Sequence, residues 1–259
     1  MELKLPVKTA QNYKSLSQKA RVMTETWTLS NMYCPACVAN SLNRAPTGTP
    51  VVDFFCENCE SVFQLKALSK PIGRKIVDAA YDTMIKAILN DRLPHFLILG
   101  YNNLTVSVND LVLIPNFCLP ASAIEARKPL APTARRAGWI GCNIILDLVP
   151  PDGRIQIIHS SNIIPKSSVR QKFITALPLA GIASKKRGWT LDVLSLIRSL
   201  DKMEFSISDA YSFEKVLSEK HPENRHVKDK IRQQLQILRD LGFLKFTSPG
   251  RYCLIESSL

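Results

Sequence analysis

The sequence predicts an α/β protein that consists of a mixed sheet with an embedded zinc site, followed by a C-terminal winged-helix domain. Three observations predict this fold class: helical and β-rich segments alternate, four cysteines form two CxxC pairs, and the last part combines three helical segments with a hairpin. A chain of 259 residues that is 46% hydrophobic can bury a sizeable core. We expect two domains, residues 1–182 and 183–259.

The net charge of the chain is +12, which favours a polyanionic partner, either a nucleic acid or an anionic membrane. A membrane is the weaker interpretation, because the sequence has no apolar run of about 18 residues. Its N-terminal segment also lacks the apolar core of a signal peptide. We therefore expect a cytoplasmic protein without a membrane partner. No obligate protein partner is evident, so we expect a monomer.

The four paired cysteines predict a structural zinc site. Cys34 and Cys37 form one CxxC pair, Cys56 and Cys59 form the second, and 18 residues separate the pairs. This arrangement matches the four-thiolate zinc pattern, in which the gap is about 15 to 20 residues. Four thiolates fill a tetrahedral coordination sphere and leave no position for water, so Zn²⁺ here is structural and not catalytic. The alternative is that buried thiols happen to lie at this spacing.

The elements of the first domain follow from hydrophobic spacing and residue type. Residues 11–29 and 73–93 have apolar residues at helical intervals and predict two helices. Five segments rich in β-branched, aliphatic and aromatic residues predict strands: 51–56, 61–66, 95–102, 110–117 and 153–160. Cys118, Cys142 and Cys253 have no partner by spacing and are interpreted as small core residues.

Three polar residues near the second cysteine pair form a candidate catalytic site. If Asp53 lies on one strand and Gln64 and Lys66 on the next, the period of two places Gln64 and Lys66 on one face. In a metal-dependent phosphodiesterase, Asp53 and Gln64 would bind Mg²⁺, and Lys66 would orient a water molecule or offset charge on the phosphate. The pattern is weak alone, because solvated residues on an exposed strand pair would give the same spacing.

The C-terminal segment predicts three helices closed by a β-hairpin. Residues 189–200, 206–220 and 226–242 have helical spacing; Ser208 is placed to cap the second helix and Gly242 to end the third. Residues 243–255 form two short strands around the turn Ser248–Gly250. Together they predict a winged helix.

The third helix of this domain has a basic face opposite its apolar stripe. That face and the wing tip suit a helix in the major groove with a wing beside the phosphates. An amphipathic helix with a solvated basic face is the alternative. The candidate DNA-binding residues of this domain are Lys228, Lys230, Arg232, Gln233 and Arg251, and Gln236 lies on the same face.

Residues 127–143 have the composition of a binding loop. The loop contains prolines and glycines, which prevent a regular element, and Trp139 lies close to Arg135 and Arg136. Arg127, Lys128, Arg135 and Arg136 can bind phosphates or guanine edges, while the indole packs on a base or a methyl group. Trp139 could instead be a core anchor beside solvated arginines.

Several sequence blocks together resemble the DpnI-like restriction endonucleases of type IIM. They are "SQKARVMTETW", "YCPAC", "DFFCENC", "RKPLAPTARRAGWIGCNI", "SKKRGWT" and "KIRQQLQILRD". The resemblance implies a PD-(D/E)XK nuclease domain with a zinc clip, and a winged helix that reads the same site independently. It implies cleavage of double-stranded DNA within GATC only when adenine carries an N6-methyl group. It also implies that Asp53 and Lys66 are catalytic and that Trp139 reads the methyl group.

Gln64 departs from the pattern of this family, which has a glutamate before the lysine. An amide oxygen can still bind Mg²⁺, but without charge, so we expect a working enzyme with a raised Mg²⁺ requirement or an altered preference for Mn²⁺. Glu25, near the end of the first helix, is a further candidate carboxylate. The alternative function is a zinc-ribbon and winged-helix transcription regulator without nuclease activity. The net charge, the zinc site and the winged helix fit this alternative equally well.

Overall fold

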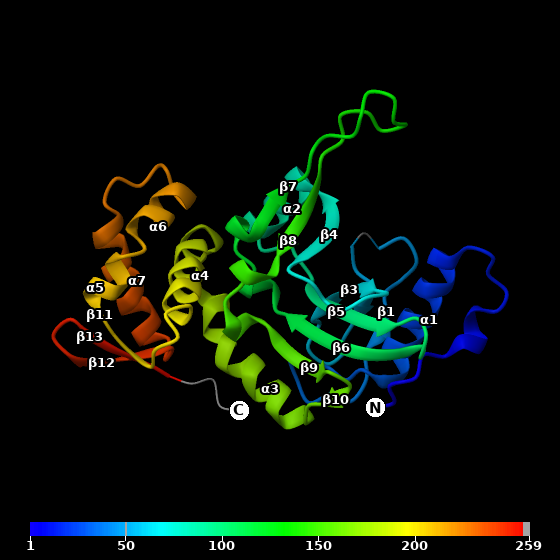
Figure 1. Ribbon diagram of the computed structural model, residues 1–259. Coiled ribbons are helices and arrows are strands. Elements are labelled where there is room, and N and C mark those ends of the chain that lie inside the picture. Colours follow the sequence, from blue (N-terminus) through cyan, green and yellow to red (C-terminus); the bar gives the residue numbers. More distant parts are fainter. Residues whose placement is uncertain (50, 256–259) are drawn as a thin grey trace. The chain divides into compact units, whose positions relative to one another are not determined.

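The computed structural model describes residues 1–49 and 51–255 (Figure 1). The chain forms two compact units. The first unit comprises residues 1–73, 93–116 and 154–175. The second comprises residues 74–92, 117–153 and 176–259. The predicted domain boundary after residue 182 therefore lies inside the second unit.

A seven-stranded mixed sheet forms the first unit, in the order β1-β2-β3-β5-β6-β9-β10. Strands β3 and β5 are parallel and all other neighbours are antiparallel. The predicted mixed α/β fold is confirmed. The strands are β1 (Asn43–Arg44), β2 (Phe54–Phe55), β3 (Val62–Leu68), β5 (His95–Asn102), β6 (Ser107–Ile114), β9 (Ile155–His159) and β10 (Asn162–Ile163).

Strand β5 is the centre of the core of this unit, since all its residues except Asn102 are buried. A strand covered on both faces reads as a continuous apolar run, which is why residues 95–102 are recognisable in the sequence. The helices of the unit are η1 (Val7–Ala10), α1 (Leu16–Asn31) and α3 (Lys166–Ala176). Helix α1 buries Trp27, whose indole N–H donates to the carbonyl oxygen of Glu2 at 2.7 Å.

The second unit contains a three-stranded antiparallel sheet that the sequence does not predict. Its order is β4-β8-β7, formed by β4 (Lys75–Ala80), β8 (Gly141–Ile145) and β7 (Ile124–Ala126). The prediction of one helix over residues 73–93 is wrong in its first half, because β4 pairs with β8 and the helix α2 covers only Tyr81–Leu89. Short 3-10 helices lie between β6 and β7, between β8 and β9, and after α3: η2 (Asn116–Cys118), η3 (Ala121–Ala123), η4 (Leu146–Leu148), η5 (Pro151–Gly153) and η6 (Leu177–Gly181).

The predicted winged-helix arrangement is present in the second unit. Its elements are α4 (Ser184–Arg198), β11 (Glu204–Ser206), α5 (Ile207–Tyr211), α6 (Glu214–Lys220), α7 (Val227–Asp240), β12 (Leu244–Ser248) and β13 (Arg251–Leu254). Strand β13 lies between β11 and β12. The middle predicted helix is divided into α5 and α6. Its cap is Ser206 and not Ser208, because Ser206 and Asp209 form a reciprocal capping box.

Polar contacts join helix α4 to the remainder of the second unit. Asp192 is fully buried and accepts hydrogen bonds from Ser122 Oγ at 2.6 Å and Lys220 Nζ at 2.8 Å. Arg198 donates to both carboxylate oxygens of Asp152, at 2.7 and 3.0 Å. A buried charge is tolerated when it is paired and hydrogen-bonded in this way. No helix in the described part of the chain is long and apolar enough to cross a membrane.

Candidate active site, zinc centre and DNA-binding surfaces

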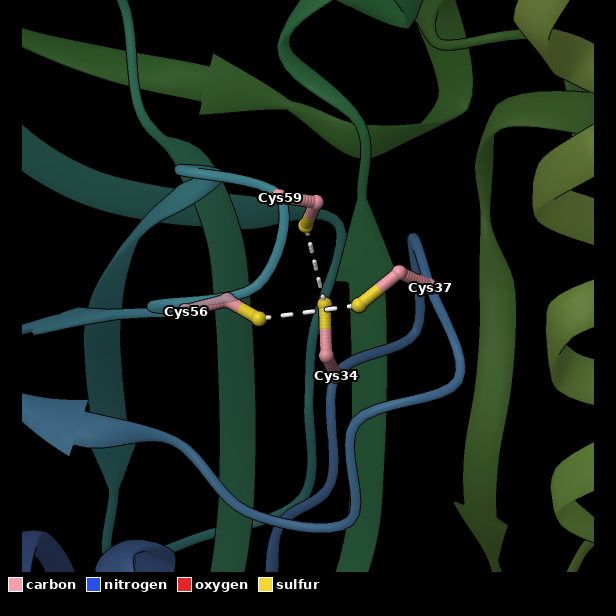
Figure 2. Close-up of side chains that lie close together, drawn as sticks. All are labelled: Cys34, Cys37, Cys56 and Cys59. Carbon is pink, nitrogen blue, oxygen red and sulfur yellow. Dashed lines mark hydrogen bonds between the residues drawn. The ribbon is translucent and has the colours of Figure 1, made fainter.

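The four predicted zinc ligands lie together, as Figure 2 shows. The Sγ atoms of Cys34 and Cys59 are 3.6 Å apart, as are those of Cys37 and Cys56, and all four lie within 4.8 Å of one another. A tetrahedral ion with Zn–S bonds of about 2.3 Å requires sulfur atoms about 3.8 Å apart. The cluster therefore fits one Zn²⁺.

Hydrogen bonds fix the first cysteine pair. The backbone N–H of Cys34 donates to the carbonyl of Ala39 at 3.1 Å, and the N–H of Ala39 donates to Sγ of Cys37 at 3.4 Å. The amide of Asn58 reaches the same sulfur at 3.3 Å. Burial raises the pKa of the Cys37 thiol, but the donors from Ala39 and Asn58 outweigh burial and lower this pKa to about 6. The thiolate, which is the metal-binding form, is thereby favoured.

Helix α3 supports the same knuckle through Arg170. Its guanidinium donates to the carbonyl oxygens of Cys34 at 3.2 Å and Ala39 at 2.8 Å. It also lies over the ring of Tyr33, 5.2 Å from the ring centroid. The two hydrogen bonds join residues 136 and 131 positions apart in the chain, so no local sequence pattern could have identified Arg170.

The second cysteine pair forms the turn between strands β2 and β3. The N–H of Cys56 donates to the carbonyl of Ser61 at 2.9 Å, and the N–H of Glu60 donates to the carbonyl of Cys56 at 2.8 Å. Asp53 directly precedes β2, and β3 carries Gln64 and Lys66. The zinc cluster therefore lies at the turn of the hairpin that carries the candidate catalytic residues.

Asp53 is held against strand β3. Its backbone N–H donates to the carbonyl oxygen of Phe63 at 2.9 Å, and its Oδ2 accepts from the N–H of Leu65 at 2.7 Å. Continuing the register of Phe54 with Phe63 by one residue places Asp53 opposite Gln64. Burial raises the pKa of Asp53, whereas the Leu65 N–H and the positive charge of Lys66 lower it, and the net change is upward. The structure thus brings these candidate residues to one place.

Glu25 joins this group from helix α1. Its two carboxylate oxygens accept hydrogen bonds from Arg21 Nε at 2.7 Å and Arg44 Nη1 at 2.5 Å. The negative charge of Glu25 also contributes to the raised pKa of Asp53. Arg21 and Arg44 are not among the residues that the sequence predicts for this site. The spacing of four residues between Arg21 and Glu25 on a helix is the only local signal for this group.

The predicted binding loop connects β7 to β8 and extends away from the three-stranded sheet (Figure 1). Arg127, Arg135 and Arg136 are exposed, whereas Trp139 is half-buried. The guanidinium of Arg136 lies 4.6 Å from the centroid of the Trp139 ring. A Cβ atom added at Gly141 would lie 2.8 Å from that ring, so the indole packs directly on the glycine backbone. The ring is therefore held within its own loop.

Most predicted DNA-binding residues of the winged helix are exposed. They are Lys228, Arg232 and Gln233 on helix α7 and Arg251 at the start of β13. Lys230 differs, because it is half-buried, donates to Gln233 Oε1 at 2.7 Å and lies 6.0 Å from a ring centroid of Trp189.

Three further cysteines, Cys118, Cys142 and Cys253, lie outside the zinc cluster. Cys118 and Cys142 are buried, as expected for small core residues, and Cys253 is half-buried. Gly153 packs on Cys118, since a Cβ atom added at Gly153 would lie 2.5 Å from the Cβ of that cysteine.

Two family models match this chain and together cover most of it. The model described as DpnI, Dam-replacing family, matches residues 1–181. The model described as DpnI_C, Dam-replacing HTH domain, matches residues 185–253. The first match contains the zinc cluster, the candidate catalytic residues Asp53, Gln64 and Lys66, and the loop with Trp139. The second contains the winged helix.

Proposed function

The chain belongs to the Dam-replacing family of DpnI-like restriction endonucleases, and from this we propose that it cuts double-stranded DNA within GATC where adenine carries an N6-methyl group. The observation that carries the proposal is the position of Asp53, whose carboxylate is bonded to the strand that bears Gln64 and Lys66. A net charge of +12 suits a DNA substrate.

Asp53 and Gln64 are the proposed ligands of a catalytic Mg²⁺. Both side chains offer oxygen atoms, which a hard cation such as Mg²⁺ accepts as ligands, and the bound ion would polarise the scissile phosphate and acidify a water molecule. Lys66 lies close enough to Asp53 to lower the pKa of that carboxyl, so its charge acts at the same centre. We assign Lys66 the orientation of the attacking water or the neutralisation of charge on the phosphate.

Structural Zn²⁺ in the Cys34 cluster is the second proposed metal. Its role is to hold the turn between β2 and β3, which keeps Asp53 opposite Gln64. Four sulfur ligands leave no coordination position for the phosphate, so the ion has no direct part in the reaction.

Trp139 is the proposed reader of the methyl group. The N6-methyl of adenine lies in the major groove and offers apolar surface, which favours an aromatic wall. Burial of one methyl is worth about 0.8 kcal/mol, or about a fourfold preference. Sharp discrimination therefore needs two methyl groups and a second reader, for which we propose helix α7 with Lys228, Lys230, Arg232 and Gln233, and the wing residue Arg251. Arg127, Arg135 and Arg136 would bind the backbone or guanine edges beside Trp139.

The experiment that tests this function compares two preparations of one plasmid, with and without N6-methyladenine in the GATC sites. Incubation with the protein and Mg²⁺ should give discrete fragments from the methylated plasmid alone, and Asp53→Asn should give none. Equal cleavage of both plasmids would contradict the methyl dependence. A mobility shift without cleavage would identify a DNA-binding regulator instead. We propose that the active protein is a monomer, which size-exclusion chromatography tests.

A further inference from the structure

Two arginines surround Glu25 beside the candidate catalytic centre. Arg21 lies one turn before Glu25 on helix α1, and Arg44 lies on strand β1. Each guanidinium bonds a different oxygen of the Glu25 carboxylate, at 2.7 and 2.5 Å. Only 11% of the Glu25 side chain is exposed, against 74% for Arg21 and 49% for Arg44. The carboxylate is covered, and the two cations face solvent.

The position of this group relative to Asp53 follows from a backbone contact and from the bonds of Glu25. Strand β1 leads directly to Asp53, because the N–H of Ala45 donates to the carbonyl of Asp53 at 2.9 Å. Arg44, the register partner of Phe54, bonds Glu25, whose charge acts on Asp53. Arg21 and Asp53 are close enough for each charge to shift the pKa of the other residue. The two guanidinium groups therefore lie near the place where the scissile phosphate would be bound.

The charges of the group decide between two roles for Glu25. As a metal ligand, Glu25 would need a lone pair directed at the ion and a site without neighbouring cations. Both its oxygens already accept charge-assisted hydrogen bonds, and two positive charges outweigh its single negative charge. A divalent cation is disfavoured at such a site, whereas a phosphate is favoured, because guanidinium groups bind phosphate oxygens with directed donors.

We propose that Arg21 and Arg44 bind a phosphate of the DNA backbone beside the Asp53 centre, and that Glu25 is a positioning residue that holds both guanidinium groups there. The proposal rests on the proposed nuclease function for its substrate. It replaces the expectation that Glu25 is a further metal ligand. The bonds to the buried Glu25 also restrict both arginine side chains before DNA binds. Each arginine therefore loses less side-chain entropy on binding DNA.

The test is the salt dependence of DNA binding by the full chain without Mg²⁺. The probe is a short duplex with one methylated GATC site. Each phosphate contact contributes about 0.9 to the slope of log K against log salt. Arg21→Ala and Arg44→Ala should each lower that slope by about 0.9, and Arg44→Lys should retain it. Arg74→Ala, which removes another exposed, ion-paired arginine, is the matched control and should leave the slope unchanged.

Glu25→Gln separates positioning from metal binding in a cleavage assay. The variant should raise KM for the duplex several-fold while the half-saturating Mg²⁺ concentration stays within about twofold of the parent. A tenfold rise in half-saturating Mg²⁺ would make Glu25 a metal ligand and overturn the proposal. So would unchanged salt slopes in Arg21→Ala and Arg44→Ala whose thermal unfolding shows them to be folded. Since binding is measured without cleavage, an inactive parent protein would contradict the nuclease function and leave the binding test decisive.

Discussion

Removal of zinc should abolish cleavage, although four sulfur ligands leave zinc no coordination position for the phosphate. Strand β2 has two residues and pairs with β3 only through Phe54 with Phe63 and Phe55 with Val62. So short a hairpin is marginal without further support. The cysteine cluster at its turn supplies that support, and Asp53 precedes β2 directly.

The expected magnitude follows from the free energy of zinc binding. Structural Zn²⁺ contributes about 10–16 kcal/mol in zinc-finger peptides near neutral pH, which is comparable to the stability of about 5–15 kcal/mol of a typical domain. Loss of the ion should therefore disorder the hairpin. A displacement of about 1 Å at a catalytic group can cost about a hundredfold in rate. We expect the rate of cleavage to fall by at least that factor.

The assay uses a zinc-selective chelator in excess Mg²⁺, with zinc content measured on the same samples. Cleavage should fall in parallel with zinc content and return when Zn²⁺, but not additional Mg²⁺, is added. Cys37→Ser should behave like the zinc-free protein, whereas Cys253→Ser, which changes a half-buried cysteine outside the cluster, should not. Full activity in protein without zinc would refute the argument that the ion holds Asp53 in place.

Three further predictions concern single residues. Gln64→Glu adds a charged ligand, which at an effective dielectric constant of 20 can strengthen Mg²⁺ binding by a few kcal/mol. Half-saturating Mg²⁺ should therefore fall at least tenfold, since about 1.4 kcal/mol already corresponds to a factor of ten. An unchanged requirement would remove Gln64 from the metal site. Burial lowers the pKa of His95 to about 4, so the folded protein holds this ring in its neutral form. The resulting contribution to folding stability is fully present above about pH 6.5, the ordinary pKa of histidine, and is lost as pH falls toward 4. The free energy of unfolding, measured with urea, should therefore fall between pH 7 and pH 5 by about 2 kcal/mol more in the parent than in His95→Gln. Equal decreases in the two proteins would contradict this. Gly141→Ala places a methyl 2.8 Å from the Trp139 ring and should reduce cleavage of methylated DNA as Trp139→Ala does, with the melting temperature as a check that both variants fold.

The four-cysteine cluster and the large sheet were predictable because their signals are local. The two CxxC pairs encode the coordination chemistry directly, and the buried strand at residues 95–102 contains the continuous apolar run 96–101. Strand β4 was missed because its buried positions include Asp78 while Val77 is 58% exposed. Because a polar residue is buried and an apolar one exposed, the strand lacks the usual alternation of polar and apolar residues in the sequence. The helical spacing of the residues that follow then makes the whole segment resemble one helix.

The candidate site was predictable only in part. Spacing alone gave weak support for Asp53 and Lys66, because the pattern does not show that the carboxylate of Asp53 bonds the Leu65 N–H. Arg44 is 19 residues from Glu25, and Arg170 is 136 residues from Cys34. Contacts of this kind depend on the completed sheet, so neither arginine has a local signal in the sequence.

Cleavage of the methylated plasmid in the presence of Mg²⁺ tests the central claim most directly. The parent protein should give discrete fragments whose ends lie within GATC, and Asp53→Asn should give none under the same conditions. The unmethylated plasmid should stay intact at enzyme concentrations that digest the methylated one completely. Intact methylated plasmid after incubation with zinc-loaded, DNA-binding protein would contradict the claim that the Asp53 centre is a nuclease site.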